Sequence, residues 1–151
     1  MSPLLLTDRP ARPILGFFRL RVLRAGRRIE DMAEPNLVVT GAATILALLL
    51  GGSVAGNSVT QIGFGTNLTA AAVGNTALTG AYDKAVDSVS WPVAGSVQFN
   101  FSLASAEANG MAIGEFGLLT PGGTLIARKV RSAALNKDTD ISLSGSWTIT
   151  F

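Results

Sequence analysis

Acidic side chains are the main candidates for chemistry in this chain, which contains no histidine and no cysteine. Glu107 and Glu115 could act as the acid and base of a glycosidase, whose two carboxyl groups lie about 5–10 Å apart. Their spacing is compatible with neighbouring strands, but it specifies no such geometry. An ion pair of Glu115 with Arg128 or Lys129, across a predicted hairpin, explains Glu115 more simply. We therefore expect both glutamates to have structural roles.

Two further patterns suggest a ligand but lack the groups that would hold one. Gly63-Phe64-Gly65 follows a predicted strand, yet neither a lysine nor a helix N-terminus comes next to bind a phosphate. Asp138 and Asp140 lie in a predicted turn, whereas Ca²⁺ takes about six or more oxygen ligands. The absence of histidine also removes the usual acid/base of hydrolase triads and the commonest zinc ligand. We expect no catalytic residue, no metal and no cofactor.

The basic residues are concentrated near the N-terminus. Seven of the twelve lysines and arginines fall within the first 28 residues, and the acidic residues Glu30, Asp31 and Glu34 follow directly. We expect the arginines to pair with these acids across a hairpin, at about 0.2–1 kcal/mol for each exposed pair, or to bind an acidic protein. Nucleic acid is the less favoured partner, because no helix carries the arginines and acids neutralise them.

The composition favours a subunit of an assembly. Only 15% of the residues are charged while 48% are hydrophobic, and glycine, serine, threonine and alanine make up much of the remainder. Such a surface suits permanent contacts with other copies or other proteins, which are less charged than free surfaces. No apolar run approaches the roughly 20 residues of a membrane span. The longest, residues 42–50, is predicted to be a buried helix.

The N-terminal third is predicted to contain an arm, a hairpin and this helix. Three prolines in residues 1–13 predict an extended arm, followed by a single domain over 14–151. Residues 15–23 alternate as a strand, Ala25-Gly26 turns, and residues 28–32 return before Pro35-Asn36 ends the hairpin. A short strand at 37–39 precedes the helix, with Thr40 at its N-cap and glycines at its C-terminal end.

The remaining residues are predicted to be strands and turns. The strands are expected at 59–64, 82–91, 97–103, 111–119, 124–130 and 141–151, with a loop of small residues at 65–80. Gly145 is expected to form a bulge and Trp147 to lie in the core. This pattern predicts a mainly β protein, an antiparallel β-sandwich with one short helix and an extended N-terminal arm. The candidate partner-binding residues are Arg9, Arg12, Arg19, Arg21, Asn67, Thr69, Asn75 and Thr79.

Several phrases, read in order, resemble a family of small structural proteins of tailed bacteriophages. They are RIE at 28–30, PNLVVTG at 35–41, LLLGG at 48–52, IGFGT at 62–66, NTAL at 75–78, EFGLL at 115–119, GTLIAR at 123–128 and WTITF at 147–151. The resemblance spans about 16–151. It implies a non-catalytic virion subunit in the tail or baseplate, or one that attaches tail fibres, made in the bacterial host cytoplasm.

The resemblance also implies partners. Tail components repeat with the symmetry of the tail, so it implies a homo-oligomer, a trimer or hexamer, in contact with other virion proteins and with its arm on a neighbouring subunit. Three alternatives stay open. One is a carbohydrate-binding module at a fibre tip, for which Trp91 and Tyr82 offer the only plausible aromatic platform. The others are a capsid decoration protein and, less favoured in a chain with no histidine and few acids, a polysaccharide-cleaving enzyme.

Overall fold

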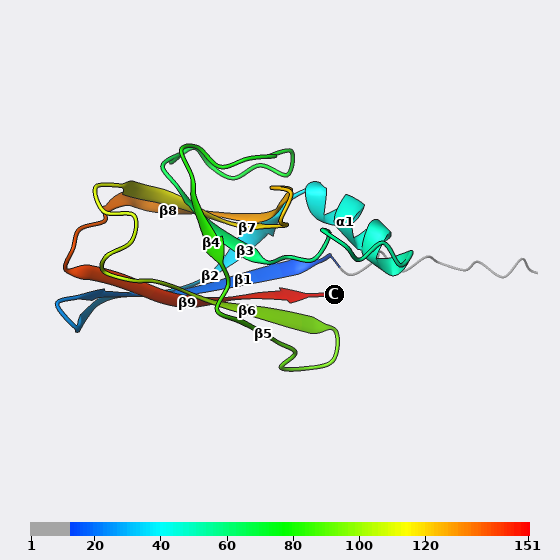
Figure 1. Cartoon of the computed structure of the whole chain (residues 1–151), viewed down its shortest axis with the longest axis horizontal. Helices are drawn as coiled ribbons and strands as arrows, with labels where there is room; N and C mark the ends of the chain where they lie inside the picture. Colours follow the sequence, from blue (N-terminus) through cyan, green and yellow to red (C-terminus); the bar gives the residue numbers. More distant parts are fainter. Residues whose placement is uncertain (1–12) are drawn as a thin grey trace, which may run out of the picture.

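The chain forms an antiparallel β-structure with one helix (Figure 1). The computed structural model describes residues 13–151, so the predicted arm lies almost entirely outside the described residues. The elements are β1 (Leu15–Arg24), β2 (Arg27–Val38), α1 (Gly41–Leu50), β3 (Gln61–Gly65), β4 (Tyr82–Ala85), β5 (Ser88–Ser90), β6 (Ser96–Leu103), β7 (Ala112–Leu119), β8 (Leu125–Asn136) and β9 (Ile141–Thr150). No helix within this part of the chain is long and apolar enough to cross a membrane.

The strands form one sheet that curls into a half-barrel. Their order is β4-β3-β7-β8-β2-β1-β9-β6-β5, and every neighbouring pair is antiparallel. Figure 1 shows two layers facing each other, with β3, β4, β7 and β8 in one and β1, β5, β6 and β9 in the other. The predicted mainly β, antiparallel fold with one short helix is confirmed, and its two layers are halves of a continuous sheet.

Aromatic side chains fill the space between the two layers. Phe18 of β1 lies at the centre, with its ring centroid 4.8 Å from that of Phe116 and 4.9 Å from that of Trp147. Phe101 stacks on Phe18, and Phe64 packs edge-on against both Phe101 and Phe116. All five side chains are buried, which confirms the expected place of Trp147. Aromatic residues carry large apolar areas, so this cluster is the main source of hydrophobic stabilisation.

Strand β2 joins the two layers, and it is longer than predicted. It pairs with β1 from Arg27 to Asn36 and continues without a break through Pro35-Asn36, so the prediction that these residues end the hairpin is wrong. Its other edge pairs with β8 only through Leu37 and Val38. Proline donates no backbone hydrogen bond, and it is tolerated here because β2 has no ladder partner on that edge at Pro35.

Helix α1 lies where predicted but is not buried as predicted. Only Ala42 and Ile45 are buried, while Leu50 is 91% exposed. The helix ends in a Schellman motif, in which the Ser53 and Gly52 N–H groups donate to the Leu48 and Leu49 carbonyls. Thr40 occupies the N-cap position, but its side chain makes no capping hydrogen bond. The helix therefore covers one end of the core with a narrow face, as Figure 1 shows.

The structure corrects four smaller predictions. The predicted strand at 59–64 is Gln61–Gly65, and the one at 82–91 is two short strands, β4 and β5. Strand β8 runs on to Asn136 instead of ending at 130. Gly145 forms no bulge, since β9 keeps regular register with both β1 and β6 there. A Cβ on Gly145 would lie 2.2 Å from the Arg19 carbonyl oxygen, so close packing explains this glycine.

Candidate functional site

A buried ion pair lies between β7 and β8. The Arg128 Nε donates to the Glu115 Oε2 at 2.6 Å, and the two side chains are 2% and 0% exposed. This confirms Arg128, of the two cations considered, as the partner of Glu115. Because charges leave water only at a high cost, such a pair persists only when hydrogen bonds satisfy its remaining atoms. Its other contacts therefore show what the pair holds in place.

Those contacts all lead to one loop, residues 66–81, here called the clamped loop. The Glu115 Oε1 accepts hydrogen bonds from the backbone N–H of Thr79 at 2.7 Å and of Asn67 at 3.3 Å. The Arg128 Nη2 donates to the Thr69 carbonyl, and the Nη1 donates to the Asn75 Oδ1, both at 3.0 Å. Four of the predicted partner-binding residues thus converge on the ion pair.

These four residues have a structural task that the sequence analysis did not foresee. The Asn67 Oδ1 accepts from the Thr69 N–H at 2.9 Å, and the Asn75 Oδ1 accepts from the Ala72 N–H at 2.8 Å. The side-chain oxygens of Asn67 and Asn75 and the backbone groups of Thr69 and Thr79 therefore fix the course of the loop. The groups left to meet a partner are the outward side chains of the same loop, among them Leu68 and Val73, which are 46% and 59% exposed.

Glycines on the neighbouring strands let the clamped loop approach closely. A Cβ on Gly65 would lie 2.3 Å from the Glu115 Oε1, and one on Gly114 would lie 2.9 Å from the Leu68 Cδ2. Gly63 and Gly65 therefore leave room for neighbouring side chains. This close packing explains the Gly63-Phe64-Gly65 motif without a bound nucleotide. The clamped loop itself contains no charged residue. The result is a fixed, uncharged surface over β3 and β7 (Figure 1).

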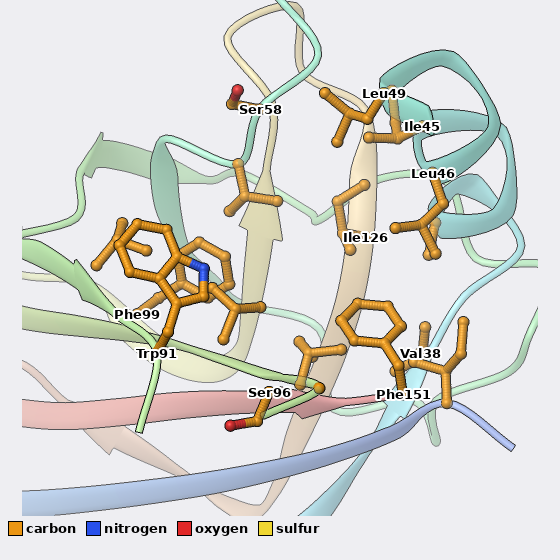
Figure 2. Close-up of a pocket in the computed structure, with 17 residues that line it drawn as sticks. Val38, Ile45, Leu46, Leu49, Ser58, Trp91, Ser96, Phe99, Ile126 and Phe151 are labelled. Atoms are coloured by element: carbon orange, nitrogen blue, oxygen red, sulfur yellow. The ribbon is translucent and has the colours of Figure 1, made fainter. Parts of the chain in front are cut away.

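A second surface feature is an apolar groove at the end of the half-barrel that α1 covers. This cavity of about 560 Å³ is bounded by α1, by the segment around Trp91 and by the C-terminal Phe151. Figure 2 shows Leu46 and Leu49 of α1 on one side and Trp91 on the other. Among the residues of 13–151 that line it, only Ser58, Ser96 and the Trp91 indole carry a polar side-chain atom. Sequence reasoning missed the groove, because residues far apart in the chain form it.

The hairpin arginines lie on the exposed surface of β1. Arg21 pairs with Asp31 across the hairpin at 3.5 Å, as predicted, and Arg28 also reaches Asp31 at 2.8 Å. The Arg19 guanidinium lies 5.2 Å from the Phe17 ring centroid. Exposed pairs of this kind contribute little stability. Arg9 and Arg12 lie outside the described residues.

Glu30 and Glu34 pair with a different strand from the one predicted. Both guanidinium ends of Arg131 bind Glu30 at 2.9 Å, and Lys129 binds Glu34. These cations belong to β8, so the expectation that the hairpin arginines pair with all three acids is wrong for Glu30 and Glu34. The side-chain bridges join β2 to β8 beyond the short stretch in which their backbones pair.

The other acids considered for chemistry have local partners. Glu107 binds Lys84 at 2.9 Å and accepts the Ala104 N–H at 2.7 Å, and these contacts lower the pKa of its carboxyl group. Asp138 accepts the Thr139 N–H, and Asp140 lies 3.5 Å from Arg24. Within residues 13–151, no group of three or more acidic, histidine or cysteine residues is arranged to hold a metal ion.

The buried Lys137 holds the loop between β6 and β7 in place. The Lys137 Nζ donates to the Ser105 carbonyl at 3.0 Å, the Asn109 Oδ1 at 2.7 Å and the Asp138 carbonyl at 3.1 Å. Burial lowers the pKa of this lysine, and burial likewise raises the pKa of Asp83. All three protons of the ammonium group have an acceptor, so its role is structural.

No family model, no curated protein and no solved structure matches the chain.

Proposed function

We propose that the protein is a non-catalytic structural subunit of a tailed-phage virion, in the tail or baseplate or attaching tail fibres. In this role it is made in the bacterial host cytoplasm and assembles as a trimer or hexamer with other virion proteins. The resemblance of the sequence phrases described above supplies the virion context. The surface of the molecule supplies the physical argument for a subunit.

The observation that carries the proposal is the exposure of large apolar side chains in the chain segments that contribute to the apolar groove. Leu50 is 91% exposed, Trp91 is 74% exposed and Val93 is 65% exposed. An apolar groove with an exposed tryptophan in its lining is the kind of surface that subunits cover on assembly. The clamped loop adds a second surface without charge, held rigid by the buried ion pair. A rigid surface loses little conformational entropy when it binds.

The direct test is mass spectrometry of purified phage particles whose genome encodes this chain. The proposal predicts that the protein copurifies with intact virions in a fixed, multiple copy number and stays with the tail fraction when heads and tails are separated. Its presence only in the lysate, with none in purified particles, would overturn the proposal. Its presence in the head fraction would favour a capsid decoration protein instead.

A second candidate is a carbohydrate-binding module at a fibre tip, and the exposure of Trp91 favours it. An exposed indole offers a flat apolar face that can stack on a sugar ring. Tyr82, the other aromatic residue considered, lies on β4, whereas the segment around Trp91 follows β5 at the opposite edge of the sheet. A glycan array separates the candidates: binding that the substitution Trp91→Ala abolishes would support the module, and no binding would dismiss it.

A further inference from the structure

The apolar groove has the chemistry of a receptor for aliphatic side chains. Its walls are aliphatic residues of α1 and β-strand residues such as Val97 and Ile126, with Trp91 and Phe151 at its edges (Figure 2). Within residues 13–151, no residue with a charged side chain lines it. Burying a leucine in such a place removes apolar area from water on both partners. The groove therefore selects a hydrophobic segment that carries no charge at its centre.

The chain itself contains such a segment. Residues 4–6 are three consecutive leucines, and they are the only large aliphatic residues between Met1 and Ile14. Ile14 lines the groove, so the N-terminal segment joins the described part of the chain at the groove itself. From Ile14, eight extended residues span at most about 26–29 Å to Leu6.

The prolines of this segment indicate which copy of the groove the leucines reach. To enter the groove beside its own Ile14, the segment would have to reverse direction within residues 7–13. Pro10 and Pro13 have a fixed φ, and they disfavour helical backbone at Arg9 and Arg12, so the sequence predicts an extended connection. This preference favours the groove of a neighbouring molecule over the groove beside the same Ile14.

We infer that Leu4, Leu5 and Leu6 of one copy dock in the apolar groove of a second copy. This inference rests on the proposed function, because it supplies the contact that makes the chain an oligomer. Each copy gives one segment and receives one, so the contact closes into a symmetric ring, is exchanged between two copies, or continues into a polymer. The groove and the leucines cover each other's apolar surface in the assembly.

Trp91 provides the reporter for a test, because it lines the groove while Trp147 is fully buried in the core. The variant is the full-length triple substitution Leu4→Ser, Leu5→Ser and Leu6→Ser, and the matched control is Thr7→Ser with Asp8→Asn in the same segment. Molar mass by light scattering and tryptophan emission are measured for each. All changes lie outside the described residues 13–151, and circular dichroism verifies that the fold is unchanged.

The inference predicts that the triple variant dissociates and that its Trp91 emission shifts to longer wavelength, with both properties unchanged in the control. Three leucines of this kind raise the dissociation constant of the oligomer by at least about 100-fold. A synthetic peptide of residues 2–12, added to the triple variant, restores the shorter wavelength in a saturable way. The same peptide with serine at 4–6 does not.

Two results would overturn the inference. If the triple variant keeps both the oligomeric mass and the emission of the parent, the leucines do not occupy the groove, while an oligomer through other surfaces still stands. If the parent is a monomer whose emission shifts on substitution, the leucines fill their own groove and not that of a second copy. Mass spectrometry of virions tests the structural role independently of either result.

Discussion

The side chains of Glu115 and Arg128 connect strands β7 and β8 to the clamped loop. The carboxylate receives two loop N–H groups, and the guanidinium donates to a loop carbonyl and a loop amide oxygen. In a buried site each charge depends on the other, because neither has water as a substitute. The pair therefore decides whether residues 66–81 hold their position.

The first prediction concerns removal of one member of this pair. Arg128→Met leaves the Glu115 carboxylate buried without its cation, and we expect unfolding free energy to fall by about 3–5 kcal/mol. Chemical denaturation measures this loss, and hydrogen exchange at the Thr79 and Asn67 amides should quicken in the folded variant. The control Arg21→Ser removes an exposed ion pair and should cost less than about 1 kcal/mol. Equal losses in the two variants would contradict the clamp.

The second prediction uses two glycines that differ only in their surroundings. The Cβ of Gly145→Ala would lie 2.2 Å from the Arg19 carbonyl oxygen and 2.5 Å from the Phe101 ring. We expect this variant to lose about 1–3 kcal/mol of stability because the strands must shift apart. Gly74→Ala, whose Cβ meets nothing within 4 Å, should stay within about 0.5 kcal/mol of the parent. A neutral Gly145→Ala would show that β9 adjusts freely.

At the scale of elements, α1 and the loops at the strand ends set the shape of the binding surfaces. Helix α1 buries only Ala42 and Ile45, and its Leu46 and Leu49 line the apolar groove. The sequence predicts its position well, because Gly51-Gly52 and the apolar run mark its bounds. It does not predict the exposure, because hydrophobicity alone does not distinguish a buried face from a surface that binds a partner.

The third prediction separates those two kinds of apolar residue on one helix. Ile45 is 6% exposed and touches the core, so Ile45→Ala should cost about 2–5 kcal/mol. Leu50 is 91% exposed, and Leu50→Ala should leave stability within about 0.5 kcal/mol of the parent. Thermal or chemical unfolding of the two variants measures both values. A comparable loss from Leu50→Ala would mean that α1 packs more tightly than this structure describes.

The fourth prediction concerns the contact between β4 and the turn at Glu107. Lys84 and the Ala104 N–H lower the pKa of Glu107 in the folded state from the usual 4.5. The stability that the carboxylate contributes is therefore complete above about pH 4.5 and is lost as pH falls through the lower, folded pKa. We expect the stability difference between the parent and Glu107→Gln to shrink in that acidic range. Denaturant unfolding between pH 2.5 and 7 measures it.

The pKa of Asp83, the neighbour of Lys84 in the chain, shifts in the opposite direction to that of Glu107, because burial raises it in the folded state. Protonation of Asp83 therefore favours folding as pH falls. Both proteins retain Asp83, so its contribution is common to the two titrations. A difference that stays constant down to pH 2.5 would contradict the role of the Lys84 contact.

At the scale of the whole molecule, most strands and the antiparallel fold could be predicted from alternation and turn residues. Ala25-Gly26, for example, adopts the positive φ angles expected of a tight hairpin turn. The ion-pair partners of Glu30 and Glu34 are harder to predict, because the curl of the sheet brings these acids to Lys129 and Arg131 of β8. Sequence patterns indicate the periodicity of neighbouring residues, whereas the half-barrel depends on contacts between residues more than 90 positions apart in the chain.

The candidate site shows the same division. The sequence indicates the loop residues Asn67, Thr69, Asn75 and Thr79, and the structure brings their polar groups to one buried ion pair. The apolar groove has no comparable local signal, because Leu46, Trp91 and Phe151 come from distant segments. Low charge is the single global property that connects both surfaces with assembly.

The measurement that tests the assembly claim most directly is the solution molar mass of the full-length chain, by light scattering at several concentrations. We expect a stable trimer or hexamer, or polymers that grow with concentration, because other copies cover the exposed apolar side chains. A monomer of 15.6 kDa at every concentration would contradict it.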